Sequence, residues 1–273
     1  MKNSEQKRAL AVAVKAARAA GRLMRQNLRA TKTVNEATRH DIKLELDVRC
    51  QKLIERKLLA AFPAIGFLGE EGESQTDTAD LRWVVDPIDG TVNFAYGIPH
   101  ACVSIALQVR SPESKARNTQ HATRLTGYDT IVGVVYDPFA DELWTAIRGG
   151  PAHLNGKIIR VSNRRELRDA IVSTGFAKSA ANLKRALPYF LWLVRRVRKV
   201  RMMGAAALAL TYVATGRFDA YVERGVNLWD IAAGGLIIES AGGTFWREPS
   251  AGGGRFRMVA SNGLIDKKLP RPK

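Results

Sequence analysis

The sequence predicts an α/β protein in which helices and sheets stack in layers. Two observations point to this class: strand-like segments alternate with helical segments in both halves of the chain, and 46% of its 273 residues are hydrophobic. This length suits one large domain or two coupled lobes. We expect an N-terminal α+β lobe over residues 1–150 and a C-terminal α/β lobe over residues 151–273, acting as one functional unit.

Two amphipathic helices are expected first along the chain. Small apolar residues at helical spacing mark residues 6–27, and a second apolar stripe runs over residues 47–61 until Pro63 ends it. The next elements are apolar or alternating segments of strand length, at 65–69, 82–86, 100–109, 130–137 and 142–150. The last two of these strands are predicted to form a β-hairpin.

The second half alternates strand and helix. The predicted strands are the segments at 169–176, 200–203, 217–223 and 256–263. The predicted helices are the segments at 180–197, 204–216 and 228–243. Gly216 is the expected end of the second of these helices. Residues 111–127 are polar throughout, which predicts a surface insertion.

Charge and cysteine content restrict the setting of the protein. The net charge of +17 favours anionic partners, such as phosphorylated metabolites, nucleic acid or acidic lipid. The basic residues are spread along the chain, which favours a solvated surface over a nucleic-acid site. No run of eighteen apolar residues and no secretion-signal core occur, so we expect a cytoplasmic protein without a membrane span. Cys50 and Cys102 lie in apolar segments, which predicts buried free thiols.

The most informative segment is RWVVDPIDGTVNFAYGIP, residues 82–99. A buried strand is expected to end at Asp86, and a turn then brings Asp89 into the same small volume. Two such carboxylates repel each other unless a cation lies between them. Oxygen-only ligands suit Mg²⁺, and the absence of His or Cys nearby in sequence argues against zinc.

Further residues extend this acidic motif. Gly90 and Thr91 are expected to open a helix whose free amide groups can bind phosphate oxygens. Glu70 and Glu71 follow an apolar strand, and Asp230 begins a helix. Asp230 is equally well explained as an N-cap, which would stabilise the helix by about 1 kcal/mol without any catalytic role. Metal ions beside a phosphate cradle are suited to phosphate ester hydrolysis.

The segments WVVDPIDGTVNFAYGIP and NLWDIAAGGLIIESAGG resemble the two signatures of the inositol monophosphatase family, and FLGEE resembles its third acidic element. The resemblance runs through nearly the whole chain in order. It implies an alternating αβαβα sandwich, the fold of inositol monophosphatase and fructose-1,6-bisphosphatase. It also implies a Mg²⁺-dependent, lithium-sensitive phosphate monoester hydrolase that forms a homodimer and acts on a small phosphorylated polyol or sugar.

The resemblance also implies roles for particular residues. Two to three Mg²⁺ ions would be held by Glu70, Asp86, the backbone carbonyl of Ile88, Asp89 and Asp230. Glu70 and Thr91 would position and activate the attacking water, with Asp89 as a third catalytic residue. The substrate would be contacted by Asp89, Gly90, Thr91, Gly204, Ala205, Ala206, Glu223 and Asp230. A carboxylate such as that of Glu223 can accept hydrogen bonds from polyol hydroxyls, although a strand-end surface acid is the alternative explanation.

Several positions depart from the family pattern. Ala205 stands where Ser or Thr is usual, which removes one hydroxyl contact to a substrate. Leu44 and Leu46 replace a small polar segment, and Asn227-Leu228 replace the usual residues before Trp-Asp. The predicted insertion at 111–127 is also longer than expected. The acidic motif itself is intact, so these departures bear on substrate identity and lithium response.

Two kinds of alternative remain open. Within the fold, the substrate could instead be fructose 1,6-bisphosphate, histidinol phosphate or a 3′-phosphoadenosine nucleotide. The segment GTVNF favours the inositol branch over the nucleotide branch, in which a Lys usually follows Gly-Thr. The other alternative is an RNA-binding or transcription-associated factor that retains the fold, motivated by the net charge of +17 and the segment LVRRVRKVR. No basic motif is interleaved with aromatic residues, so nucleic acid is not the favoured partner.

Overall fold

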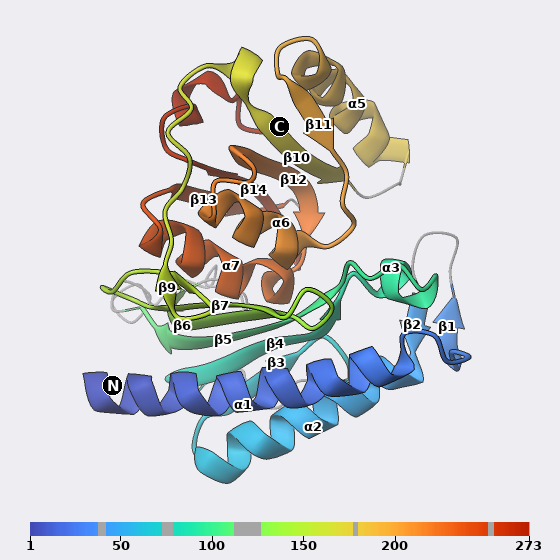
Figure 1. Cartoon of the computed structure of the whole chain (residues 1–273), viewed down its shortest axis with the longest axis vertical. Coiled ribbons are helices and arrows are strands. Elements are labelled where there is room, and N and C mark those ends of the chain that lie inside the picture. The colour runs from blue at the N-terminus through green and yellow to red at the C-terminus, as the bar shows by residue number, and fades with distance from the viewer. Residues whose placement is uncertain (38–41, 73–78, 112–126, 177–179, 251–253, 273) are drawn as a thin grey trace.

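The computed structural model describes residues 1–37, 42–72, 79–111, 127–176, 180–250 and 254–272. Helices and sheets alternate in five layers: a helix pair, a seven-stranded sheet, a second helix pair, a five-stranded sheet and a single helix (Figure 1). This arrangement confirms the predicted layered α/β fold. Most of the predicted insertion, residues 112–126, lies outside the described residues.

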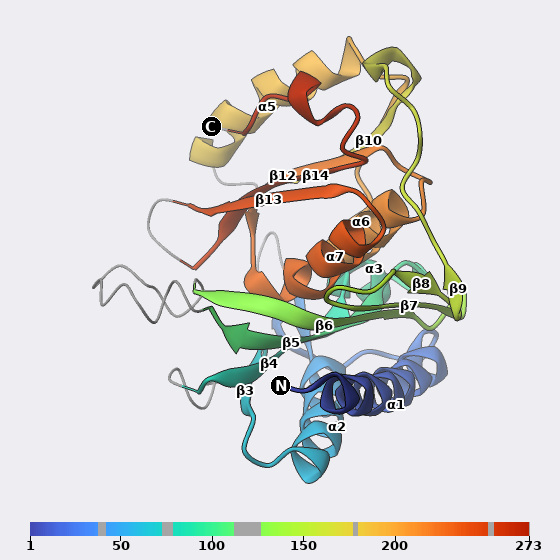
Figure 2. The ribbon, with the colours of Figure 1, turned by 90° about the vertical axis from the view of Figure 1, so that its left-hand side faces the viewer.

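The first layer consists of α1 (Asn3–Asn27) and α2 (Glu45–Ala61), which lie side by side under the large sheet (Figure 2). The buried face of α1 consists mainly of alanines, which let the helix lie close to its neighbours. On the predicted stripe, Gly21 and Met24 are buried, whereas Leu10 and Val14 are half-buried. Leu44 and Leu46, the two leucines that depart from the family pattern, are buried in the hydrophobic core between these helices and the large sheet.

The seven-stranded sheet keeps its strands in sequence order across the sheet. The strands are β3 (Gly66–Gly69), β4 (Leu81–Asp89), β5 (Cys102–Arg110), β6 (Tyr128–Asp137), β7 (Glu142–Ile147), β8 (His153–Leu154) and β9 (Lys157–Ile158). Only the first pair is parallel; every later pair is antiparallel. The predicted hairpin is confirmed, because β6 and β7 pair with Asp137 opposite Glu142.

One strand end differs from the prediction. The strand that was expected to end at Asp86 continues to Asp89, and its pairing with β5 shifts register between these two residues. Pro87 has no N–H to donate to the ladder, which accounts for the interruption. The N–H of Ile88 turns instead to Asp86 Oδ1, at 3.0 Å. The two carboxylates therefore lie on either side of a bulge within an extended chain.

The middle layer consists of α6 (Ala206–Ala214) and α7 (Leu228–Ser240), which lie between the two sheets (Figure 2). Both helices are apolar nearly all round, as expected for helices covered on two sides. A glycine allows the close approach of α7 to β6: a Cβ at Gly133 would stand 2.8 Å from the carbonyl oxygen of Ala233. Gly216, with φ of 70°, follows α6 as predicted.

The five-stranded sheet has the order β11 (Lys199–Arg201), β10 (Ile171–Phe176), β12 (Ala220–Val226), β14 (Phe256–Ser261) and β13 (Thr244–Pro249). Its outer face is covered by α5 (Ala180–Val194). The remaining elements are α3 (Thr91–Ala95), the ribbon of β1 (Val34–Ala37) and β2 (Ile42–Leu44), and 3-10 turns at Leu167–Asp169 and Asp266–Lys268. Strand β13 was not predicted; its side chains are half-buried or exposed and lack a clear alternation.

Two predictions about the setting can be compared with the coordinates. Cys50 and Cys102 are both buried and free, as predicted. Within the part of the chain that the structure describes, no helix combines the length and the apolar character needed to cross a membrane.

Candidate active site

The bulge at the end of β4 positions two buried carboxylates. Asp86 is 2% exposed and Asp89 is 7% exposed. Asp89 lies opposite Cys102 of β5, whose Sγ is 3.6 Å from Asp89 Oδ2. The sequence predicted no cysteine near these acids. That prediction is wrong, because the antiparallel partner strand brings Cys102 beside Asp89. The described residues that line the adjacent cavity include neither Cys nor His.

Gly90 is required where the chain leaves β4 for α3. Its φ is 92°, in the left-handed region that glycine adopts readily. A Cβ there would also stand 2.9 Å from the carbonyl oxygen of His100 and 3.1 Å from the Cβ of Ala205. Thr91 then begins the short helix, and its hydroxyl donates to the carbonyl of Ile88 at 2.9 Å.

Asp89 joins the two halves of the site. Its carboxylate accepts hydrogen bonds from the N–H groups of Ala206 (3.0 Å) and Ala207 (2.7 Å), at the start of α6. A carboxylate at a helix N-terminus satisfies free amides and interacts favourably with the helix dipole. Asn93 reinforces the connection, because its amide donates to the carbonyls of His100 and Met203 at 2.9 Å each. The segment Gly204–Ala206 is thereby held against the end of β4.

Glu70 directly follows β3 and is placed by a side chain from α2. The Gln51 amide bonds both backbone groups of Glu71: its Oε1 accepts the N–H at 2.8 Å, and its Nε2 donates to the carbonyl. The N–H of Glu70 itself donates to the carbonyl of Val85 at 3.1 Å. Glu70 is therefore held from both sides, by the neighbouring strand and by the helix beneath.

Asp230 lies in the first turn of α7, and the prediction that it is an N-cap requires correction. The N-cap is Asn227, and Asp230 is the third helical residue, whose Oδ2 accepts the N–H of Asn227 at 2.7 Å. This reciprocal arrangement is a capping box. The structural role does not exclude a second one, because a carboxylate can accept about four hydrogen bonds or metal contacts.

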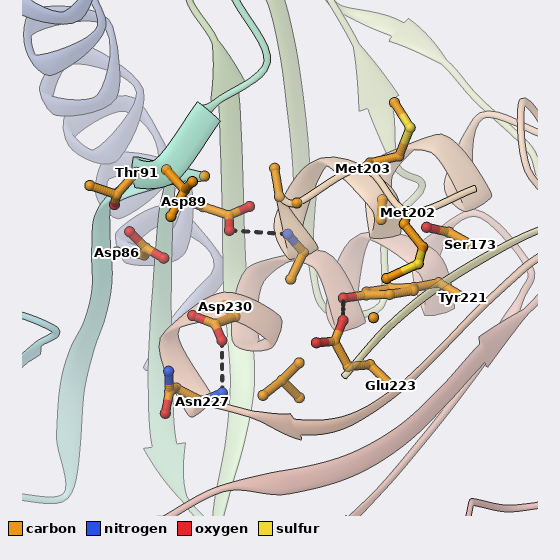
Figure 3. A pocket seen from close by; sticks show the side chains of 18 of the residues that line it. Asp86, Asp89, Thr91, Ser173, Met202, Met203, Tyr221, Glu223, Asn227 and Asp230 are labelled. Carbon is orange, nitrogen blue, oxygen red and sulfur yellow. Dashed lines mark hydrogen bonds between the residues drawn. The ribbon is translucent and has the colours of Figure 1, made fainter. Parts of the chain in front are cut away.

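These elements enclose a cavity of about 430 Å³. Every residue that the sequence analysis assigned to the site lines it: Glu70, Asp86, Ile88, Asp89, Gly90, Thr91, Gly204, Ala205, Ala206, Glu223 and Asp230. In Figure 3, Asp86, Asp89 and Asp230 surround one space, while Glu223 lies on the other side of it beside Tyr221. The described lining residues include five acids and no Lys, Arg or His.

Burial raises the pKa of each of these acids, and repulsion by neighbouring acids adds to the shift for Glu70, Asp86 and Asp230. Burial raises the pKa of Glu70 to about 8 and that of Asp89 to about 6. The pKa of Asp86 is raised well above its usual value by burial and then by the charges of Glu70 and Asp89. Burial likewise raises the pKa of Asp230, with the charge of Asp89 as the next cause. Each shift reports a negative charge that no protein cation neutralises.

Glu223 forms a separate acidic group at the far side of the cavity. It projects from β12, and the hydroxyl of Tyr221 donates to its Oε2. Burial raises the pKa of Glu223 to about 7. Tyr221 was missed by the sequence analysis. The signal was present, because residues two apart on a strand project to the same face and Tyr221 precedes Glu223 by two.

The whole chain can now be compared with known proteins. The family model described as the inositol monophosphatase family matches residues 5–114 and 125–266. The chain belongs to the inositol monophosphatase family. It is a family of phosphoric monoester hydrolases, as the sequence signatures predicted.

Individual relatives carry two kinds of name. The inositol-1-monophosphatase of Rhizobium meliloti is 40% identical over 232 residues, which is 82% of this chain and 80% of the relative. Nus factor SuhB of Xylella fastidiosa is 39% identical over 241 residues, 87% of this chain and 81% of the relative. The crystal structure of extragenic suppressor protein suhB from Bartonella henselae matches with a TM-score of 0.81 and 34% identity, covering 94% of this chain and 95% of that one.

Metal ions are implied by the inositol monophosphatase family, so the donor set was compared with their chemistry. Its buried members are carboxylates and a backbone carbonyl, the oxygen ligands that Mg²⁺ prefers. As the side chains stand, no three His, Cys, Asp or Glu side chains of the described residues lie close enough together to hold one ion. The charges of Glu70 and Asp89 nevertheless contribute to the raised pKa of Asp86, as expected of neighbouring acids. The donor set therefore fits a hard cation by its chemistry, although the described side chains do not enclose one ion as they stand.

Proposed function

We propose that the protein is a Mg²⁺-dependent phosphatase that hydrolyses the phosphate monoester of a small polyol, with inositol 1-phosphate as the leading substrate. One observation carries the proposal: five acids and no cationic side chain line the described cavity of a chain whose net charge is +17. Such a cavity repels phosphate unless cations neutralise the acids. Membership of the inositol monophosphatase family supports the reaction type.

We assign the reacting end of the substrate to the bulge and the short helix that follows it. Two to three Mg²⁺ ions, held by Glu70, Asp86, the Ile88 carbonyl, Asp89 and Asp230, would neutralise the phosphate and lower the pKa of water. The Thr91 hydroxyl donates its hydrogen to Ile88, so its lone pairs can accept a hydrogen from the attacking water. Glu70 is the acceptor for that water's proton, and the amides of Gly90 and Thr91 bind phosphate oxygens.

We assign the polyol end to the opposite wall. Glu223 accepts hydrogen bonds from polyol hydroxyls, and the hydrogen bond from Tyr221 fixes the carboxylate that does so. Gly204, Ala205 and Ala206 form the adjacent wall of the cavity. Because Ala205 offers a methyl group where Ser or Thr is usual, the site makes one hydrogen bond fewer. We therefore expect several small phosphate monoesters to be accepted.

Phosphate release from a substrate panel tests this proposal. The panel contains inositol 1-phosphate, fructose 1,6-bisphosphate, histidinol phosphate and a 3′-phosphoadenosine nucleotide, each with and without Mg²⁺. We expect inositol 1-phosphate to have the highest kcat/KM and EDTA to abolish turnover. Asp86→Asn should be inactive, whereas Glu239→Gln, on the surface end of α7, should behave as the unmodified protein. A higher kcat/KM for the nucleotide than for every sugar phosphate, or turnover without any divalent ion, would contradict the assignment.

Lithium sensitivity, dimer formation and a cytoplasmic location are further parts of the proposal. Lithium should inhibit turnover at saturating Mg²⁺, and light scattering should give twice the chain mass. Exposed apolar residues on α5, Leu187, Leu191 and Val194, support an interface with a second copy. The two free thiols support a reducing compartment. Turnover that is insensitive to lithium would contradict the proposed lithium sensitivity, and a monomer mass in solution would contradict the proposed dimer. Neither result would affect the phosphatase assignment.

A second candidate function is a transcription-associated role that involves RNA. It is supported by the net charge of +17 and by the 39% identity with a relative named Nus factor SuhB. The test is RNA binding across a salt titration, with the unmodified protein and Asp86→Asn. Binding that falls steeply with salt and survives the substitution would support a role independent of catalysis. Binding that is weak at 150 mM salt in both proteins would count against it.

A further inference from the structure

A second cavity, which we call the arginine pocket, lies on the outer side of the five-stranded sheet. It has a volume of about 280 Å³ and is enclosed by β12, α5 and the C-terminal residues. Figures 1 and 2 show the C-terminal end of the chain beside α5. Three arginines line it, one from each wall: Arg185 from α5, Arg224 from β12 and Arg271 from the C-terminal segment. The arginine pocket shares Thr174, Gly175 and Glu223 with the candidate active site.

The guanidinium of Arg224 lacks compensation within the described structure. Arg224 lies directly opposite Arg257 in the antiparallel pair of β12 and β14, and like charges in such positions repel. Arg257 is compensated, because it forms an ion pair with Glu248 and donates to the carbonyl of Pro272. Nε and Nη1 of Arg224 are buried and have no hydrogen-bond partner among the described residues. A buried charged donor without a hydrogen-bond partner destabilises the folded state, because it has lost its hydration without gaining another contact.

The surrounding arginines add to this positive charge. The pKa of Arg224 is lowered first by burial and then by the charges of Arg185 and Arg257. Arg271 is paired with Asp266, at 3.0 Å between Nη2 and Oδ2. Among the described residues, the charge without a partner therefore belongs mainly to Arg185 and Arg224. An anion between these two would relieve the repulsion and satisfy the buried N–H groups.

The apolar wall of the pocket carries one more free donor. The rings of Tyr189 and Trp192 pack together with their centroids 5.8 Å apart. The hydroxyl of Tyr189 is buried and has no hydrogen-bond partner among the described residues. The pocket thus offers guanidinium donors and a phenol donor beside aromatic surface. This chemistry is that of a phosphate site, because Arg side chains bind phosphate oxygens through paired, charge-assisted hydrogen bonds.

We propose that the arginine pocket binds a phosphate group, as a second anion site next to the candidate active site. The phosphate can belong to the far end of a doubly phosphorylated substrate whose other end reaches the acidic cavity, or to a separate phosphorylated compound. The two sources share the same contacts with Arg185, Arg224 and Tyr189. Binding of phosphate at this site does not depend on the proposed phosphatase activity; only the first source does.

Calorimetric titration with inorganic phosphate in EDTA tests the site. Without divalent ions the acidic cavity repels phosphate, so binding reports the arginine pocket. We expect one phosphate per chain, and we expect Arg224→Gln and Arg185→Gln each to weaken binding about tenfold or more. Arg195→Gln removes the same charge from an exposed position outside the pocket and should change binding less than twofold. Undetectable binding to the unmodified protein, or equal weakening by Arg195→Gln, would overturn the proposal.

Two further measurements complete the test. Arg224→Gln should raise the unfolding midpoint in the absence of phosphate, because it relieves repulsion. Added phosphate should then raise the midpoint of this variant less than that of the unmodified protein.

KM values identify the source of the phosphate. An increase in Arg224→Gln for fructose 1,6-bisphosphate but not for inositol 1-phosphate indicates the substrate's far end; unchanged values for both indicate a separate compound. A protein that binds phosphate here but hydrolyses no ester would refute the proposed function and leave this site standing.

Discussion

Asp89 shows how one side chain can combine a structural task with the catalytic task that we propose for it. One carboxylate accepts two amide hydrogen bonds at the start of α6 while lining the acidic cavity. The amides compensate part of its charge, which explains why its pKa rises only to about 6 although it is almost fully buried. The sequence predicted a chemical role for Asp89. No local pattern predicts its contact with α6, because the two segments lie far apart in the sequence.

Asp89→Asn is expected to lower kcat with Mg²⁺ more than a hundredfold, because the carboxylate that we propose as a metal ligand loses its charge. From sequence alone, relief of repulsion suggested higher stability for this variant. The structure adds an opposing effect, because an amide presents only one oxygen to the N–H groups of Ala206 and Ala207, and this loss of about 1–3 kcal/mol offsets the relieved repulsion. Phosphate release and urea denaturation in EDTA measure both effects. A variant that keeps most of its activity would remove Asp89 from the reaction.

Glu223 gives a pH-dependent prediction. Its pKa in the folded protein, about 7, lies above the value of an exposed Glu, so the folded state prefers the protonated form. This preference stabilises the fold below the unfolded-state pKa and is lost as pH rises through about 7. In EDTA, the unfolding midpoint of Glu223→Gln should therefore rise relative to that of the unmodified protein as the pH is raised from 5 to 8. A difference between the two midpoints that stays constant over this range would show that Glu223 ionises normally.

At the scale of elements, the site depends on contacts between segments that are distant in sequence. Gln51 of α2 holds the backbone of Glu71 next to Glu70, and Asn93 of α3 holds the segment before α6. Neither residue carries a sequence signal for its role, because an amide on a helix is usually a surface residue. Gln51 is nevertheless buried, at 8% exposure.

Gln51→Ala is expected to impair the site without unfolding the protein. It leaves the N–H and the carbonyl of Glu71 without the Gln51 partner, so Glu70 loses its fixed position. We expect kcat to fall about tenfold and the Mg²⁺ concentration for half-maximal activity to rise, as a positioning role requires. Lys52→Ala, on the exposed side of the same helix, is the matched control. Equal effects of both variants on activity would indicate a general disturbance of α2 instead.

At the scale of the whole molecule, an ion pair with a buried carboxylate fastens the segment that connects the two sheets. Asp219 is fully buried, at 0% exposure, at the start of β12. It accepts hydrogen bonds from the guanidinium Nε of Arg164 at 2.8 Å and from the N–H of Ile171 at 2.7 Å. Arg164 also donates to the carbonyl of Gly216, just past α6. The connector, the middle layer and the second sheet are thereby joined at one point.

Asp219→Ala is expected to destabilise the protein by about 1–3 kcal/mol, because the backbone N–H of Ile171 and the Arg164 guanidinium both lose their Asp219 acceptor. Asp169→Ala breaks an exposed pair with Arg198 and should cost about 0–1 kcal/mol. Urea denaturation followed by circular dichroism measures both free energies of unfolding. Similar values for the two variants would show that the Asp219 pair contributes no more than a surface pair.

The sequence by itself determined the class of fold, the order of nearly all helices and long strands, and the family. These follow from local information: apolar periodicity, turn residues and two unbroken signatures. It also identified the five acids that line the acidic cavity, because the family resemblance carried their positions. The strands it missed are short or half-exposed, like β13, so their apolar pattern is too weak to detect.

Only the tertiary structure decided how the segments meet. The bulge between Asp86 and Asp89, the capping box of Asp230 and the amide contacts of Asp89 depend on neighbours that lie far away in sequence or on backbone geometry. The arginine pocket has the same origin, since Arg224 and Arg257 become neighbours only when β12 pairs with β14. Local patterns report the environment of each residue separately, whereas the energy of a charge depends on which other charges the fold brings beside it.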